Sequence, residues 1–277
     1  MKPPGMIRNS QVFALKLSAR RVPRPLLEIT RRTLEKLMGF RKFNAIYAGM
    51  PACAAAEFPR EFLEAMQIKV TFTGLSPDEI PATGPLIVVA NHPTGLIEGL
   101  ALDAMLLRRR PDVTVMTNYI FGSIPELQER YVFVDPQRRF RRRNLNPQGW
   151  RQSFQWLARG GTLAIFPAGR VAAFQWRHMR TAEQPWSPHI AAIARRTKAP
   201  VLPVFFHGRN NWLFQLAGIL HPRLQDLLFV REIINKRGHT LRATIGPIIE
   251  PGKLSHFATD DEAIEFLSQE TAKLAHL

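Results

Sequence analysis

Short apolar runs alternate with helix-like stretches over most of the chain. Uncharged apolar runs bounded by turn residues predict strands, and apolar residues spaced three or four positions apart predict helices. The predicted strands cover residues 86–90, 113–118, 131–134, 162–166 and 201–206. The predicted helices between them cover residues 97–107, 148–158 and 189–197. Strands separated by helices predict an α/β fold, with a mostly parallel central sheet flanked by helices.

The two ends of the chain extend this pattern. A short helix near residues 60–66 precedes the alternating run IKVTFTG, which predicts a strand. Near the other end, LRATIGPII predicts a further strand, and Thr259 with Glu262 forms a capping box that begins a final helix. The sequence holds no internal repeat and no low-complexity linker. We therefore expect an α/β domain over residues 67–277, preceded by an N-terminal helical segment over residues 1–66.

That N-terminal segment contains a predicted basic amphipathic helix at residues 25–38. Its apolar residues line one side, and its basic residues Arg31, Arg32 and Lys36 fall elsewhere. The apolar residues are Leu27, Leu34, Leu37 and Met38. A helix of this kind can lie on a membrane surface or pack as an ordinary helix on a domain, and the pattern leaves both readings open.

Charge is distributed unevenly along the 277 residues. The formal net charge is +16. Basic residues are concentrated in the first 42 positions, and RRFRRR at residues 138–143 forms a second cluster. Such clusters attract polyanions, which include anionic lipid headgroups and nucleic acid. The alternative is a solvated basic surface that keeps the protein soluble.

Cysteine content and apolar run lengths exclude several classes of protein. The single Cys53 excludes an intramolecular disulfide framework and a multi-thiolate zinc site, and it is consistent with a reducing compartment. The apolar runs are shorter than the roughly 20 residues of a membrane-spanning helix. Lys16 interrupts the only apolar run near the N-terminus, so a secretory signal is not expected.

The stretch NHPTGLIEG at residues 91–99 is the first candidate for chemistry. His92 follows a predicted strand, where ligands bind in open α/β sheets, and Glu98 lies near the start of the next helix. On one continuous helix, six residues would place the two about 240° apart, so contact requires His92 to lie before the helix. Glu98 could then hold one imidazole nitrogen and leave the other as a general base. Alternatively, Asn91 and His92 only satisfy backbone groups at a strand end.

Two other strand ends carry residues that we expect at the same edge of the sheet. In IFPAGR, Gly169 lets the backbone approach a ligand, and the Arg170 guanidinium suits a phosphate or carboxylate. In VFFHGRNNW, polar residues follow directly after the strand. The expected substrate-binding residues are Asn91, Thr94, Gly95, Phe166, Pro167, Gly169, Arg170, Arg209 and Asn210. The sequence lacks the motifs G-x-S-x-G, G-x-G-x-x-G and H-E-x-x-H and a P-loop, so no metal or nucleotide cofactor is expected.

The ordered stretches NHPTGLIEG, YVFVDP, IFPAGR and APVLPVFFHGRN resemble the four blocks of the glycerolipid (lysophosphatidic acid) acyltransferase family, over roughly residues 80–250. The resemblance implies a catalytic pair at His92 and Glu98 and a fourth block around Pro203. The chain departs from the family pattern in two places. The spacing from histidine to acid is longer and ends in a glutamate, and Ala168 stands where the third block has a glutamate. Both departures resemble the branch of hemolysin-type and lyso-ornithine-lipid O-acyltransferases.

The resemblance implies transfer of a fatty acyl group from an acyl carrier protein or coenzyme A thioester to the hydroxyl of a lyso-lipid. The thioester would be a co-substrate. We expect peripheral association with the inner, cytoplasmic face of an anionic membrane, and no nucleic-acid partner. Two other classes stay open at this point. One is a non-catalytic lipid-binding or membrane-perturbing protein, and the other is a basic nucleic-acid-binding module.

Overall fold

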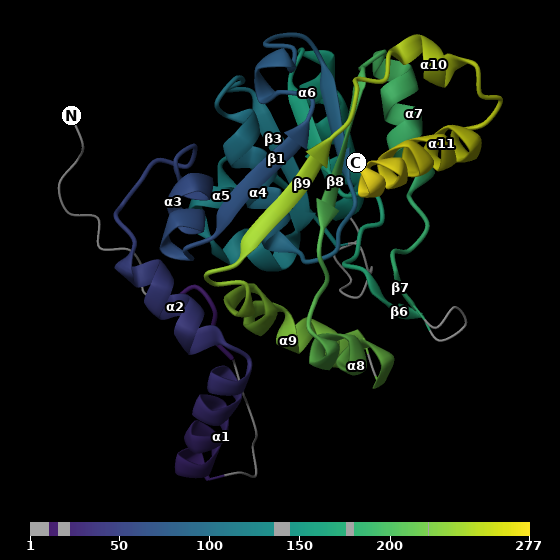
Figure 1. The fold of residues 1–277 in the computed structure, drawn as a ribbon. Helices are drawn as coiled ribbons and strands as arrows, with labels where there is room; N and C mark the ends of the chain where they lie inside the picture. Colours follow the sequence, from purple (N-terminus) through teal and green to yellow (C-terminus); the bar gives the residue numbers. More distant parts are fainter. Residues whose placement is uncertain (1–10, 16–22, 136–144, 176–179, 221) are drawn as a thin grey trace.

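A seven-stranded sheet forms the centre of the molecule in a computed structural model that describes residues 11–15, 23–135, 145–175, 180–220 and 222–277 (Figure 1). The strand order is β1-β9-β8-β2-β5-β3-β4. The strands are β1 (Lys69–Gly74), β2 (Leu86–Ala90), β3 (Val113–Asn118), β4 (Tyr131–Val134), β5 (Thr162–Ile165), β8 (Val201–His207) and β9 (Thr240–Ile245). The five strands from β8 to β4 run parallel, while β9 pairs antiparallel with β8 and parallel with β1.

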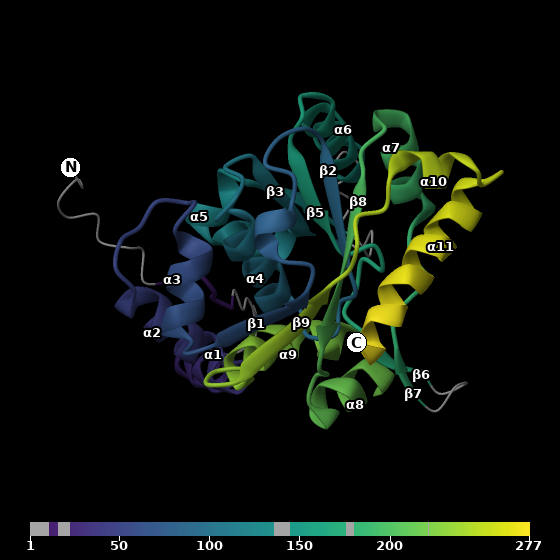
Figure 2. The same ribbon diagram turned by 45° about the horizontal axis from the view of Figure 1, so that its top comes forward.

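Helices cover both faces of this sheet, as Figure 2 shows. Alternate residues of β2 enter two separate apolar clusters, because successive side chains of a strand point to opposite faces. The longer helices are α1 (Arg24–Leu37), α2 (Phe40–Gly49), α3 (Phe58–Ala65), α4 (Leu96–Leu106), α6 (Leu145–Ala158), α7 (Pro188–Thr197), α8 (Trp212–Leu220), α9 (Pro222–Asn235) and α11 (Asp260–Lys273). Helices α2, α3 and α4 contribute to one cluster, and α6, α7 and α11 contribute to the other.

Short elements complete the described fold. They are α5 (Pro125–Gln128), α10 (Pro251–Ser255), the hairpin strands β6 (Ala173–Gln175) and β7 (Arg180–Ala182), and 3-10 turns at Pro77–Glu79, Tyr119–Ser123 and Leu274–His276. The expected α/β fold with a mostly parallel sheet is confirmed, and the predicted strands and helices appear with ends shifted by a few residues at most. The α8–α9 pair and the β6–β7 hairpin were not predicted, since both depend on tertiary packing more than on a clear local period.

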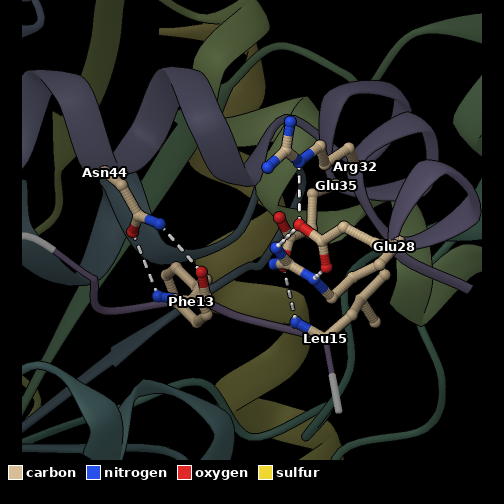
Figure 3. Close-up of polar contacts among 7 residues, drawn as sticks. Phe13, Leu15, Glu28, Arg32, Glu35 and Asn44 are labelled. Carbon is tan, nitrogen blue, oxygen red and sulfur yellow. Dashed lines mark hydrogen bonds and ion pairs between the residues drawn. The ribbon is translucent and has the colours of Figure 1, made fainter. Parts of the chain in front are cut away.

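Segment 11–15 is fixed to the first two helices by side-chain hydrogen bonds (Figure 3). The Asn44 side chain accepts from the backbone N–H of Phe13 at 3.0 Å and donates to its carbonyl at 2.8 Å. Glu35 Oε1 accepts from the Leu15 N–H at 3.0 Å. The Phe13 ring packs edge-on against Phe43, with 4.9 Å between ring centroids. These contacts hold segment 11–15 against α1 and α2 and place the Phe13 ring in the apolar core.

Helix α1 forms at the position expected for the basic amphipathic helix. Arg31 and Arg32 both donate to Glu28 and lower the pKa of its carboxyl to about 2. Leu26 and Ile29 are exposed, so the helix presents apolar side chains to solvent as well as to its neighbours. Nowhere in the described ranges is a helix both long and apolar enough to cross a bilayer. The arginine cluster at residues 138–143 lies outside the described residues.

Candidate functional site

A cavity of about 1530 Å³ lies at the carboxyl ends of β2, β3 and β5. Several apolar side chains line it, including Phe13, Leu96, Phe121, Phe214 and Phe229. The polar and basic groups in its lining come mainly from the ends of strands and from the turns that follow them. The cavity therefore offers a large apolar volume next to the strand ends, where the sequence placed its candidate chemistry.

His92 and Glu98 are in direct contact in this cavity wall. The distance from His92 Nδ1 to Glu98 Oε2 is 2.7 Å. The Glu98 side chain is completely buried, whereas the His92 side chain keeps 15% of its surface exposed and lines the cavity. Glu98 Oε2 also accepts from a backbone N–H, so we assign the hydrogen to Nδ1 of the ring. In this tautomer Nε2 carries no hydrogen and does not contact the Glu98 carboxylate, so it can accept a proton.

The turn between the two residues explains why six positions separate them. Helix α4 begins at Leu96, after Gly95 with φ of 116°, so His92 lies before the helix and Glu98 lies in its first turn. A Cβ atom at Gly95 would lie 2.7 Å from the Phe229 ring, and this conformation favours glycine. The six-residue spacing is therefore no obstacle to contact.

Glu98 is held by the same turn. Its Oε1 accepts from the Thr94 N–H at 2.5 Å and from the Thr94 hydroxyl at 2.8 Å, and its Oε2 accepts from the Gly95 N–H at 3.2 Å. With the His92 ring, four donors surround one buried carboxylate. Thr94 and Gly95, which we expected to bind substrate, thus contact the carboxylate, and Gly95 also lines the cavity.

The loop after β5 packs against the histidine. The rings of Phe166 and His92 stack with 4.2 Å between centroids and 29° between planes. The backbone N–H of Ala172 donates to the His92 carbonyl at 2.9 Å. Phe166, Pro167, Gly169 and Arg170 all line the cavity. The loop therefore fixes the ring plane of His92 and brings the Arg170 side chain into the same cavity.

The other three expected binding residues lie elsewhere. Asn91 joins β2 to β8, since its side chain donates to the Phe206 carbonyl at 2.9 Å and accepts from the Phe206 N–H at 2.6 Å. Arg209 is exposed and lies outside the cavity lining. Asn210 is buried, also outside the lining, and its side-chain N and O have no hydrogen-bond partner among the described residues. The Asn91 side chain is engaged by the backbone of β8, and Arg209 and Asn210 follow β8, whose residues are absent from the described cavity lining.

Glu183, which sequence reasoning missed, contacts the site from the end of the β6–β7 hairpin. Its carboxylate accepts from the backbone N–H of His92 and, at 3.0 Å, from Trp186 Nε1. Burial raises the pKa of the Glu183 carboxyl, and the nearby Glu98 carboxylate adds to the rise, while the bonds from Trp186 and His92 oppose it. No local motif marks Glu183, because 91 positions separate it from His92.

A second histidine ends the neighbouring strand. His207 lies at the end of β8, and its Nε2 is 2.9 Å from the Thr244 hydroxyl. Partial burial, together with the positive charge of Arg242, lowers the pKa of His207. His207 is absent from the described lining of the cavity. Two strand ends that look alike in sequence therefore hold histidines in different surroundings.

A buried ionic network lies further along α4. Arg130 donates two hydrogen bonds to Asp103, at 2.9 and 3.0 Å, and the Tyr131 hydroxyl donates a third at 3.0 Å. Burial raises the pKa of Asp103, which Arg130 opposes, and burial with the Asp103 carboxylate raises the pKa of Tyr131. Across the described residues, no three His, Cys, Asp or Glu side chains come together as a possible metal site.

Solved structures include one with a similar fold. No protein-family model and no curated protein sequence matches the chain. The crystal structure of the 1-acyl-sn-glycerophosphate (LPA) acyltransferase PlsC from Thermotoga maritima is similar, with a TM-score of 0.50 and 17% sequence identity. The similarity covers 80% of this chain and 78% of that chain. At this identity the similarity shows a shared α/β fold.

Proposed function

We propose that this protein is an O-acyltransferase that moves a fatty acyl group from a thioester to the hydroxyl of a lyso-lipid. The observation that carries the proposal is the contact between His92 Nδ1 and the buried Glu98 carboxylate beside a large, mostly apolar cavity. The four ordered sequence blocks and the fold shared with an LPA acyltransferase support the same reaction.

In the proposed reaction, His92 Nε2 accepts the proton of the acceptor hydroxyl. The hydroxyl oxygen attacks the thioester carbonyl carbon, the C–S bond breaks, and the leaving thiolate takes the proton from the imidazolium. Glu98 holds the ring in the required tautomer and stabilises the imidazolium that forms. A general base of this kind contributes roughly 10²- to 10⁴-fold to a rate.

The cavity lining supports a lipid substrate with a charged head. The apolar wall suits an acyl chain, and Arg170 offers a guanidinium for a phosphate or carboxylate. We propose acyl carrier protein or coenzyme A as the thioester carrier and a lysophospholipid or lyso-ornithine-type lipid as the acceptor, as in the hemolysin-type branch. The proposed location is the inner face of the membrane, to which the basic N-terminal residues would attract the enzyme.

The test is transfer of a labelled acyl group from each thioester to a panel of lyso-lipids, with wild type, His92→Ala and His207→Ala. His92→Ala should lose about 10³-fold in rate, while His207→Ala should stay within about twofold, since His207 lies outside the cavity lining. Circular dichroism would verify that both variants fold. Full activity in His92→Ala would overturn the mechanism, and lipid binding without turnover in wild type would favour a non-catalytic lipid-binding protein.

A further inference from the structure

Five large apolar side chains of the neighbouring helices α8 and α9 are exposed. We call the set formed by Trp212, Leu216, Leu220, Leu224 and Leu227 the α8–α9 apolar surface. Trp212 is 72% exposed and Leu220 is 68% exposed. The first three recur every four residues on α8, so they lie along one side of that helix. A group of large apolar residues exposed together marks an interaction site, whereas single exposed ones are ordinary.

The inward faces of the same helices form part of the cavity. Phe214 on α8 and Phe229 on α9 both line it, with 6.1 Å between their ring centroids. Leu227 belongs to both regions, since it lines the cavity and is 44% exposed. The α8–α9 apolar surface is therefore continuous with the rim of the cavity. Leu227 is thus the point at which this surface meets the cavity, beside the polar Gln225 and Asp226 of the same lining.

Basic helices lie next to this surface. Arg231 on α9 donates to the Leu37 carbonyl at the end of α1, and Figure 1 shows α1, α8 and α9 on the same side of the molecule, beyond the carboxyl ends of the parallel strands. The exposed basic residues of α1 and α2 are Arg24, Arg32, Lys36, Arg41 and Lys42. Asp226 on α9 is exposed too, but the chain as a whole carries a formal charge of +16.

This combination of charge and apolar surface favours a lipid bilayer as the occupant. A second copy of the chain would bring two sets of basic helices together, and like charges would oppose that contact. An anionic bilayer complements the basic helices and accepts apolar side chains at its interface, where Trp is especially favourable.

We propose that the α8–α9 apolar surface inserts into the interface of an anionic bilayer and sets the rim of the cavity against the lipid. This inference rests on the proposed function, because the inserted surface would let a lyso-lipid acceptor enter the cavity from the membrane. It differs from attachment by the basic N-terminal segment alone, since it predicts a contact that salt does not remove.

The main experiment measures sedimentation of the full chain with vesicles of equal parts phosphatidylcholine and phosphatidylglycerol, at low and high salt. The variant Trp212→Ser/Leu216→Ser/Leu220→Ser should bind about tenfold or more weakly at both salt concentrations. Phe154→Ser is the matched control, because Phe154 is also exposed but belongs to α6, which lies at the opposite end of the molecule in Figure 1. It should bind as wild type does.

Two further measurements, quenching of tryptophan fluorescence and the oligomeric state in solution, separate insertion into a bilayer from its alternatives. Brominated acyl chains should quench a component of the tryptophan fluorescence in wild type that is missing in Trp212→Phe. This variant keeps an aromatic side chain at the position. Unchanged vesicle binding by the triple variant, or equal quenching in wild type and Trp212→Phe, would overturn the proposal. So would a wild-type dimer in solution that the triple variant converts to a monomer.

Failure of this inference can be told apart from failure of the proposed function. With a short-chain lyso-lipid dissolved as monomers, the triple variant should transfer acyl groups within about twofold of the wild-type rate. His92→Ala should bind vesicles as wild type does, because His92 lies in the cavity wall. Loss of vesicle binding by His92→Ala would contradict the separation of the two surfaces.

Discussion

Two carboxylates on α4, Glu98 and Asp103, have completely buried side chains, yet they face different kinds of partner. Glu98 contacts an imidazole that lines the cavity, together with donors from its own turn. Asp103 contacts the guanidinium of Arg130 and the hydroxyl of Tyr131. A guanidinium keeps its proton at any ordinary pH, whereas an imidazole exchanges one near neutrality. Burial alone therefore does not distinguish the two acids, and the role proposed for Glu98 rests on the chemistry of its partner.

The largest effect is expected when Glu98 loses its charge. Glu98→Gln should lower the acyl-transfer rate about 10³-fold, because an amide neither fixes the Nδ1–H tautomer of His92 nor stabilises the imidazolium. The rate should be measured per folded molecule, as the amide nitrogen would also face N–H donors of the turn. A rate close to that of wild type would show that Glu98, like Asp103, has only a structural role.

Asp103→Asn should lower the stability of the fold and leave the acyl-transfer rate nearly unchanged. Removing one partner of a buried ion pair leaves Arg130 without its counter-charge, so the free energy of unfolding should fall by about 3 kcal/mol. Urea unfolding would measure this loss. The acyl-transfer rate per folded molecule should stay within about twofold, and a large fall in that rate would show that the two acids are not distinct in role.

Glu183 extends the comparison to a third carboxylate, one that contacts the backbone of His92. Its pKa is raised from the usual value of 4.5, so above pH 4.5 the folded state binds a proton that the unfolded state has released. This group's contribution to stability is present below pH 4.5 and is lost as the pH rises through its folded-state pKa. Unfolding experiments from pH 4.5 to 7.5 should therefore show a weaker fall in stability in Glu183→Gln than in wild type.

The smallest effect concerns His207, the histidine outside the cavity lining. Its pKa is lowered from 6.5, so the unfolded state binds a proton more readily as the pH falls. The contribution of neutral His207 is present above pH 6.5 and is lost as the pH falls below it. In His207→Gln, the decrease in melting temperature between pH 7 and 5 should be slightly smaller than in wild type. An identical decrease would argue that His207 titrates alike in both states.

Local patterns were sufficient for much of the fold. The uncharged run LIVVA became β2 at the predicted residues, and Thr259 with Glu262 caps α11 as the capping box predicted. The α8–α9 pair was missed, because its apolar residues lie on two sides, one toward Phe229 and the cavity and one toward solvent. A helix apolar on two sides gives a weak amphipathic period.

The sequence by itself determined that His92 and Arg170 follow buried parallel strands, because strand ends and turn residues are local features. It also limited contact with Glu98 to a geometry in which the histidine precedes the helix. Only the tertiary structure decided that Gly95 makes this turn, that Glu183 reaches the His92 backbone, and that His207 and Arg209 stay outside the cavity lining. These outcomes depend on packing between residues far apart in the chain, which no local period encodes.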